Sequence, residues 1–171
     1  VSSFMLMQST VTAAAGHGIT STVTGSEGVL ISGVTFNAVR NTALSATEAL
    51  GSWTIEGNLS RGPIGAHGVS MSGGDATVQV IGNTWEIDPD DREDPDDPDA
   101  PPAKAVAGDA IRASDALGSW TIEGNLSKGP IGGDGISMAG GDAQATMTVR
   151  NNTFENINGN GISAQDALGS W

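Results

Sequence analysis

A tandem repeat constrains the fold of this chain more than any other feature of its sequence. Residues 49–60, ALGSWTIEGNLS, return letter for letter at 116–127, and the first five letters return at 167–171. The tryptophans of the three copies are 67 and 51 residues apart, and an acidic, proline-rich insertion accounts for the difference of 16. Without the insertion the period is about 51. Such a period is typical of stacked units that bury their apolar faces against their neighbours.

A finer period of 25 or 26 residues lies within the long one. Short stretches alternate apolar and polar residues as a half-buried strand does. They lie at 30–32, 53–55, 78–80, 120–122 and 147–149. A second series starts with glycine or alanine followed by an aliphatic residue, at 18–20, 43–45, 68–70, 110–112, 135–137 and 161–163. One coil of this length holds three short strands, and successive coils pair in parallel about 4.8 Å apart.

The sequence therefore predicts an all-β fold, a right-handed parallel β-helix solenoid of about six coils of 25–26 residues, with one acidic loop insertion at 88–104. Aligning the coils places branched aliphatic residues in one inward ladder, formed by Ile55, Val80, Ile122 and Val149. Three residues later each of these coils has an asparagine, namely Asn58, Asn83, Asn125 and Asn152, and the first copy has Val34 instead. We expect these asparagines to adopt left-handed backbone at a corner and to bond to one another.

The coils also alternate in where they carry bulk. Phe36, Trp85 and Phe154 follow the corner in one kind of coil. Ser60 and Ser127 take that place in the other kind, whose bulk comes from Trp53 and Trp120. Large and small side chains are therefore expected to interdigitate between layers.

The segment VRNNTFENI at 149–157, followed by GNGI at 159–162, resembles the V-x-x-N-x-F-x-x-N/I and G-x-G-I pattern of right-handed parallel β-helix repeat proteins. These include pectate-lyase-like proteins, phage tailspikes, bacterial adhesins and autotransporter passengers. The resemblance covers nearly all of the chain outside the insertion and implies the fold, but the same coil serves enzymes, adhesins and spacers. Leucine-rich repeats are the main structural alternative, and they are disfavoured because their leucine ladder and helical side are missing. Gly-rich turns likewise disfavour an α-solenoid.

Composition excludes several classes of partner. The chain has 25 Gly and no Cys, so its turns are built on glycine and no disulfide is present. The net charge is -13, with only seven Lys and Arg, which argues against binding to nucleic acid or to anionic membranes. No run approaches the roughly 18 apolar residues that span a bilayer, so no membrane insertion is expected.

Few residues qualify as catalytic candidates. A polysaccharide lyase or epimerase needs acids close to a proton acceptor or donor. Glu56 and Glu123 repeat at one position two coils apart, and Arg150 takes the equivalent place one coil after Glu123. Because Gln79 interrupts the set beside Glu56, we interpret these residues as a cross-coil ion pair on an exposed sheet.

A turn position holds His17 and His67, and Asp134 takes this position in the third copy. Similarly, Arg61 and Lys128 replace each other between copies. A catalytic or metal-binding role requires one fixed side chain, so we interpret His17, His67 and Asp134 as solvated turn residues. The exchange of Arg61 for Lys128 indicates that only the charge matters there. No catalytic residue and no cofactor is predicted.

The insertion has a character of its own. Residues 88–99 hold seven Asp and one Glu against one Arg, a net charge of -7, and their prolines favour an extended chain. The solenoid is expected to resume near Val106. One interpretation is a solvated acidic loop, and the other is a Ca²⁺ site, although the spacing of an EF-hand is absent. The candidate calcium ligands are Asp90, Asp91, Glu93, Asp94, Asp96 and Asp97.

Repetition of nearly identical units is typical of length, stiffness and multivalent contact. The sequence therefore predicts a non-catalytic structural or adhesive segment of a large extracellular or cell-surface bacterial protein, able to form filaments. Its expected partners are copies of itself, by end-to-end or lateral packing, and surface glycans. The alternative is a polysaccharide-active β-helix enzyme, a lyase or an epimerase. An ice-binding solenoid would need a longer ladder than that of Thr54, Thr121 and Thr148. Because 167–171 begin another coil, we expect a segment of a longer repeat protein.

Overall fold

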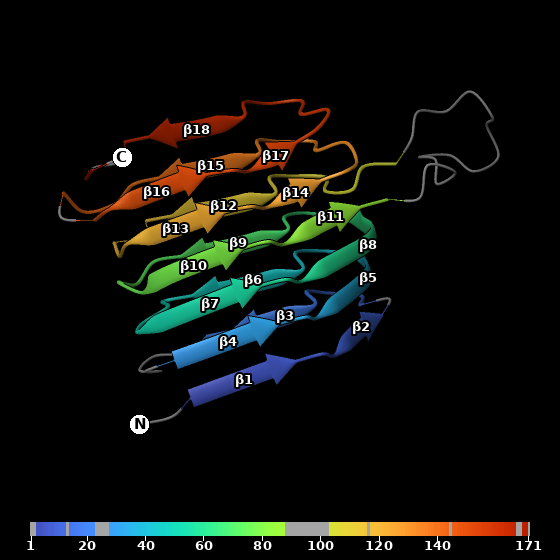
Figure 1. Ribbon diagram of the computed structural model, residues 1–171, viewed down its shortest axis with the longest axis horizontal. Coiled ribbons are helices and arrows are strands. Elements are labelled where there is room, and N and C mark those ends of the chain that lie inside the picture. Colours follow the sequence, from blue (N-terminus) through green and yellow to red (C-terminus); the bar gives the residue numbers. More distant parts are fainter. Residues whose placement is uncertain are drawn as a thin grey trace.

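Each coil of the chain contributes one strand to each of three parallel sheets, and six such coils stack into a solenoid (Figure 1). This computed structural model describes residues 3–12, 14–22, 28–87, 103–115, 117–143, 145–166 and 169–170. Within those residues no helix is long and apolar enough to cross a membrane. The predicted all-β solenoid of about six coils is confirmed. Its right-handed sense stays a prediction, based on the hand that parallel crossovers prefer.

The three sheets each contain six strands in chain order. Sheet A consists of β1 (Ser3–Met7), β4 (Gly28–Ser32), β7 (Ser52–Glu56), β10 (Thr77–Ile81), β13 (Trp120–Glu123) and β16 (Met147–Arg150). Sheet B consists of β2 (Thr10–Thr12), β5 (Thr35–Val39), β8 (Leu59–Ile64), β11 (Thr84–Glu86), β14 (Leu126–Ser127) and β17 (Thr153–Phe154). Sheet C consists of β3 (Ile19–Ser21), β6 (Leu44–Thr47), β9 (Val69–Ser72), β12 (Ile111–Ser114), β15 (Ile136–Ala139) and β18 (Ile162–Gln165).

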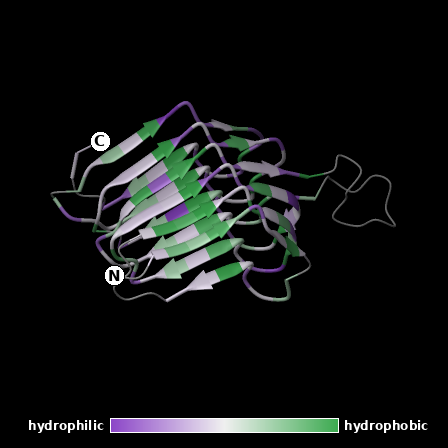
Figure 2. Cartoon of the chain, turned by 60° about the horizontal axis from the view of Figure 1, so that its bottom comes forward, coloured by the Kyte–Doolittle hydropathy of each residue, from purple (hydrophilic) through white to green (hydrophobic). Residues whose placement is uncertain are grey.

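The predicted aliphatic ladder forms on the inner side of sheet A. Val80 pairs in register with Ile55 on one side and with Ile122 on the other, and Ile122 pairs with Val149. Ile55, Val80 and Ile122 are at most 1% exposed. Along the strands hydrophobic and hydrophilic residues alternate (Figure 2), as expected for sheets with one face inside. The solenoid interior is therefore one continuous apolar core.

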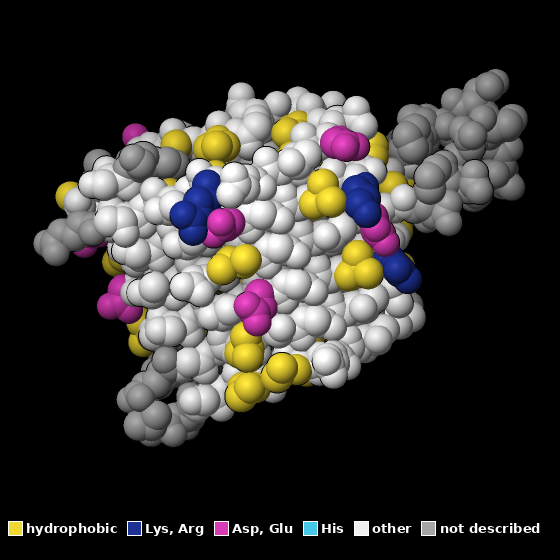
Figure 3. All heavy atoms as spheres, in the orientation of Figure 1, with side chains coloured by type: hydrophobic (Ala, Val, Ile, Leu, Met, Phe, Trp, Pro, Cys, Tyr) yellow, Lys and Arg dark blue, Asp and Glu magenta, His cyan; other side chains and the backbone are white. Residues whose placement is uncertain are grey.

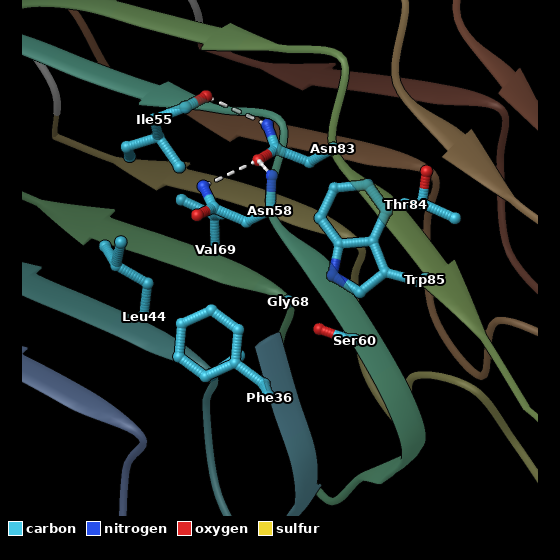
Figure 4. A pocket seen from close by; sticks show the side chains of 11 residues that line it. Phe36, Leu44, Ile55, Asn58, Ser60, Gly68, Val69, Asn83, Thr84 and Trp85 are labelled. Atoms are coloured by element: carbon cyan, nitrogen blue, oxygen red, sulfur yellow. Dashed lines mark hydrogen bonds between the residues drawn. The ribbon is translucent and has the colours of Figure 1, made fainter. Parts of the chain in front are cut away.

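Large and small residues interdigitate on the inner side of sheet B. Ser60 lies between Phe36 and Trp85 in register, and both rings surround it in Figure 4. Gly68 follows at the start of the next sheet, and a Cβ there would overlap the Trp85 indole nitrogen, so only glycine fits. A gap of about 10 Å³ remains, which is the size of one water molecule. The predicted alternation of bulk between coils is therefore confirmed.

A ladder of buried asparagines joins the coils at the corner between sheets A and B. The Asn83 side-chain oxygen accepts hydrogen bonds from the Asn58 backbone N–H (3.1 Å) and amide nitrogen (2.9 Å). The Asn83 amide nitrogen in turn donates to the Ile55 carbonyl at 2.9 Å (Figure 4). Asn125 and Asn152 continue the same pattern. These buried amides are thus paired with one another, as polar groups in a core must be.

The left-handed residue at this corner is not the asparagine itself but the one before it. Its φ is +58° at Gly57, +60° at Gly82, +63° at Gly124 and +57° at Asn151. The prediction that Asn58, Asn83, Asn125 and Asn152 adopt this conformation was therefore wrong by one residue. The left-handed turn suits glycine at three of the four sites, and it directs the following amide inward.

The solenoid resumes after the insertion where the sequence predicted. Val106 bridges in parallel to Ile64 in the preceding coil and to Ile131 in the following one. It is completely buried. Residues 88–102, which include most of the predicted acidic loop, lie outside the described residues.

Replacing Ile122 by Asp should lower the free energy of unfolding by about 3–5 kcal/mol, because an unpaired carboxylate would enter the core. Val149→Asp is the matched control, since Val149 stands in the same ladder but in the sixth coil and is only partly buried. Its cost should be clearly smaller. Urea unfolding followed by circular dichroism measures both. Equal costs for the two variants would contradict the ladder.

The duplicated segments offer a second test, because Trp53 and Trp120 have identical neighbours in sequence but different hydrogen bonds. The Trp53 indole N–H donates to the Leu50 carbonyl at 3.1 Å. Within the described residues, the buried Trp120 indole N–H has no acceptor. Trp53→Phe should therefore destabilise the chain by about 1 kcal/mol more than Trp120→Phe, which is the net value of one hydrogen bond. The difference between their unfolding free energies is the measurement, and the reverse order would refute the assignment.

Candidate functional site

The two glutamates considered as catalytic candidates, Glu56 and Glu123, lie on the outer side of sheet A, but they are not neighbours. Glu56 stands between Ser32, whose hydroxyl donates to Glu56 Oε1 at 3.3 Å, and Ile81. Ile81 separates Glu56 from Glu123. Gln79 was expected beside Glu56, but its place is two residues earlier along the strand. Two coil spacings, about 9.6 Å, therefore separate the backbones of the two glutamates, with the Ile81 side chain between them.

Glu123 forms an ion pair with Arg150 in the next coil. The Arg150 guanidinium donates to Glu123 Oε2 at 2.7 Å, and the two side chains are 60% and 27% exposed. The predicted cross-coil ion pair is therefore confirmed. At this exposure such a pair contributes at most about 1 kcal/mol. It also engages the only basic side chain in contact with these glutamates in the described part of the chain.

A second charged column, on the outer side of sheet B, was not recognised from the sequence. Glu86 lies between Arg61, which donates to Glu86 Oε1 at 3.0 Å, and Lys128, whose Nζ is 3.7 Å from Oε2. On the face shown in Figure 3, basic side chains lie beside acidic ones in the same way. Arg61 and Lys128, which replace each other between the copies, therefore contact the same acid, Glu86. Aligning Glu86 with Arg61 in the sequence would have found it.

The turn position of His17 and His67 forms another ladder between coils. Its members are His17, Thr42, His67, Asp109, Asp134 and Asn160. In most of them the side chain accepts the backbone N–H of the next coil, at 3.0 Å from Asp109 to His67 Nδ1 and at 2.8 Å from Asp134 to Asp109 Oδ1. A solvated residue was predicted here, but the His67 side chain is only 20% exposed. Its Nδ1 holds two coils together.

His67 also contacts two charged groups. Asp109 Oδ2 is 3.6 Å from its Nδ1, and the Arg112 guanidinium on β12 is 3.3 Å from its Nε2. Burial lowers the pKa of His67 below its usual 6.5, and Arg112 lowers this pKa further, whereas Asp109 opposes the shift. The sequence did not reveal this contact because the insertion increases the spacing from His67 to Asp109 to 42 positions, compared with 25 or 26 between adjacent coils elsewhere. Counting back from Ile111 in the aligned coils would have found it.

This cluster is poorly suited to general base catalysis. With Nδ1 accepting the Asp109 N–H, the neutral ring carries its proton on Nε2, which faces Arg112. Neither nitrogen then offers a lone pair to a substrate, as a general base must. The hydrogen bond from the Asp109 backbone N–H to His67 Nδ1 instead links the coils on either side of the insertion.

No group of three or more His, Asp or Glu side chains in the described ranges is close enough to hold a metal ion. The candidate calcium ligands Asp90, Asp91, Glu93, Asp94, Asp96 and Asp97 lie outside the described residues. Calcium binding by the acidic insertion therefore stays a prediction.

Acidification should destabilise the chain in part through His67. Because the pKa of His67 is lower in the folded chain than in the unfolded one, only the unfolded chain gains this proton as the pH falls below 6.5. Stability is therefore lost from pH 6.5 down to the folded-state pKa. His67→Asn should remove this part of the loss and retain an acceptor, since Asn already occupies the ladder at Asn160. Melting temperatures between pH 7.5 and 5 test this, with His17→Asn as control. An identical pH slope in wild type and His67→Asn would contradict it.

Comparison of the chain with protein-family models, with curated proteins and with solved structures finds no match. The pectate-lyase-like and adhesin relationships implied by the sequence resemblance therefore stay proposals.

Proposed function

We propose that this chain is a non-catalytic structural or adhesive segment of a large extracellular or cell-surface bacterial protein. The observation that carries the proposal is the placement of the duplicated segments. Within the duplicated segments, residues 50–60 and 117–127 lie on the same two sheets, two coils apart, as β7 with β8 and β13 with β14. The same outer surface is thus offered again after about 9.6 Å along the axis. Repetition of this kind serves reach and multivalent contact rather than a single reaction centre.

The connections between coils support a stiff rod. Backbone hydrogen bonds in three parallel sheets run along the solenoid axis, and two side-chain ladders at the corners add to them. Each coil contacts only its neighbours, so the shape extends with each added repeat. A stalk or filament exposed to the medium requires such a shape.

The outer charges also favour a structural role. Arg61 and Lys128 contact Glu86, and Arg150 contacts Glu123. Ion pairs of this kind suit an exposed sheet that must remain soluble. A base free to reach a substrate proton is what a lyase or epimerase would need instead.

Adhesion to glycans would use the outer side of sheet C. There one column of side chains consists almost entirely of hydroxyls and contains a single arginine, Arg112. Its members are Thr20, Ser45, Ser70, Arg112, Ser137 and Ser163. Each hydroxyl both donates and accepts hydrogen bonds, as sugar hydroxyls do. Weak contacts repeated at the coil spacing add up through avidity.

The test is to incubate the chain with uronate-containing and neutral polysaccharides and to follow unsaturated products and reducing ends. We expect no turnover, because in the described part of the chain Arg150 is paired with Glu123 and His67 Nδ1 accepts the Asp109 N–H, so neither is free to take up a substrate proton. Turnover that Glu123→Gln, Arg150→Ala or His67→Asn abolishes, and that Glu56→Gln preserves, would contradict the proposal. Glu56→Gln is the matched control, since Glu56 is the duplicate of Glu123 and pairs with Ser32 and Ile81 instead of an arginine.

A further inference from the structure

Arg112 differs from its neighbours on the outer side of sheet C. It lies on β12, between Ser70 of β9 and Ser137 of β15, and these three strands run side by side (Figure 1). The other coils have a serine or a threonine at the same position. The Arg112 side chain is exposed, and the backbones of neighbouring coils are about 4.8 Å away on either side. One cation therefore stands in the middle of a column of hydroxyls.

This cation has no acidic partner among the described residues. The arginines on the strands of sheets A and B, Arg150 and Arg61, each contact a glutamate instead. Arg112 Nε donates to the Ser114 hydroxyl at 3.4 Å, and Arg112 Nη1 lies 3.3 Å from His67 Nε2. A guanidinium has more N–H donors than these two contacts engage. Arg112 can therefore still donate to a ligand.

The contact between Arg112 and His67 brings two donors together. His67 Nδ1 accepts the Asp109 backbone N–H at 3.0 Å, so the neutral ring carries its proton on Nε2. The Nε2–H group and the Arg112 Nη1 group then face each other at 3.3 Å. Within the part of the chain that the structure describes, neither of the two has an acceptor at this point. An anion that accepts from both would remove the mismatch.

Charge and shape select a carboxylate as this anion. The planar guanidinium matches a carboxylate with two parallel N–H donors, and the His67 Nε2–H adds a further donor. We infer that Arg112 and His67 form a subsite for the carboxylate of an acidic sugar, and that the hydroxyls on either side bind neutral sugars of the same glycan. This inference rests on the proposed adhesive function and specifies its ligand.

The charges around the subsite limit the ligand to one acidic sugar. Arg112 is the one charged member of its column, and two acids are close to it in the chain. Asp109 Oδ2 lies 3.6 Å from His67 Nδ1, and Asp115 directly follows β12. Salt screens charges only beyond about 8 Å at physiological ionic strength, so a second carboxylate would meet these acids and no cation. A polyuronate is therefore a poorer ligand than a glycan with one isolated acidic sugar.

His17 provides an internal comparison. It takes the same turn position as His67, and its Nδ1 accepts the Thr42 backbone N–H at 3.3 Å. The residue that corresponds to Arg112 in the coil after His17 is Ser45, because Ser45 pairs with Thr20 as Arg112 pairs with Ser70. The first coil therefore has the histidine without the arginine, and it lacks the subsite.

Titration calorimetry with two matched ligands tests the subsite. The acidic probe is a xylo-oligosaccharide that carries a single glucuronate, and the neutral probe is the same molecule with its carboxyl group reduced to an alcohol. Arg112→Ser should weaken binding of the acidic probe by about 10-fold or more, as expected for lost hydrogen bonds to a charged group. Binding of the neutral probe should not change. Serine suits this position because Ser70 and Ser137 flank it.

Arg150→Ser is the matched control variant, since it removes an exposed arginine from sheet A and changes the net charge equally. It should bind the acidic probe as the wild type does. Equal losses in the two variants would overturn the inference. So would equal affinities of the wild type for the two probes, or no binding of the acidic probe at all.

Nitrogen NMR of the imidazole rings gives an independent measurement, because the chain has only two histidines. The acidic probe should shift the Nε2 signal of His67 and leave that of His17 unchanged. Acetate at the same concentration should shift neither signal, since it lacks the sugars that the hydroxyl column contacts. An equal shift of both histidines, or an equal effect of acetate, would overturn the inference. Turnover in the polysaccharide assay would contradict the proposed function whatever these results are, whereas absence of binding without turnover would overturn the subsite alone.

Discussion

The register between successive coils is the constraint on which the rest of this structure depends. A slip of one residue would turn every inward side chain outward, because residues of a strand alternate between its faces. A slip of two residues keeps each side chain on its face, and the apolar ladders alone oppose such a slip weakly, since inward residues such as Val78 and Val80 are nearly interchangeable. The asparagine ladder fixes it sharply: Asn83 Oδ1 accepts two hydrogen bonds from Asn58 in the core, and a slip would leave these buried groups unpaired. Each unpaired group would cost about 1–3 kcal/mol.

Alternating bulk explains why the sequence repeats at about 51 residues while the coil repeats at 25 or 26. An aromatic residue on one coil and a small one on the next together fill the narrow interior at core density, without voids and without overpacking. Ser60 has this role between Phe36 and Trp85. The unit that fills space is therefore a pair of coils, and a duplicated pair is what the sequence records.

In-register stacking is also why so much of the fold could be predicted from the sequence. When equal positions touch, spacing along the chain gives contacts in space directly, as it did for Ile122 beside Val149. The errors arose where the exact position of a residue within the coil repeat decides its neighbours. Gln79 was compared with Glu56, although the residue paired with Glu56 in the next coil is Ile81. The left-handed corner was placed one residue too late in the sequence. The contact of His67 with Asp109 was missed because an insertion interrupts the spacing there.

The energetics of stacking connect the fold to the proposed role. An inner coil covers both of its faces, whereas each end coil leaves one face open, so the cost of the ends is the same for a short stack as for a long one. Val149 and Phe154 show this cost, since both are only partly buried while their equivalents Ile122 and Trp85 are almost fully covered. Every added coil covers the previously open face and leaves one open face of its own, so the free-energy cost of the ends does not increase. The stability of the stack therefore increases with the number of coils. A protein that works by reach gains from a long stack, whereas a single reaction centre would not.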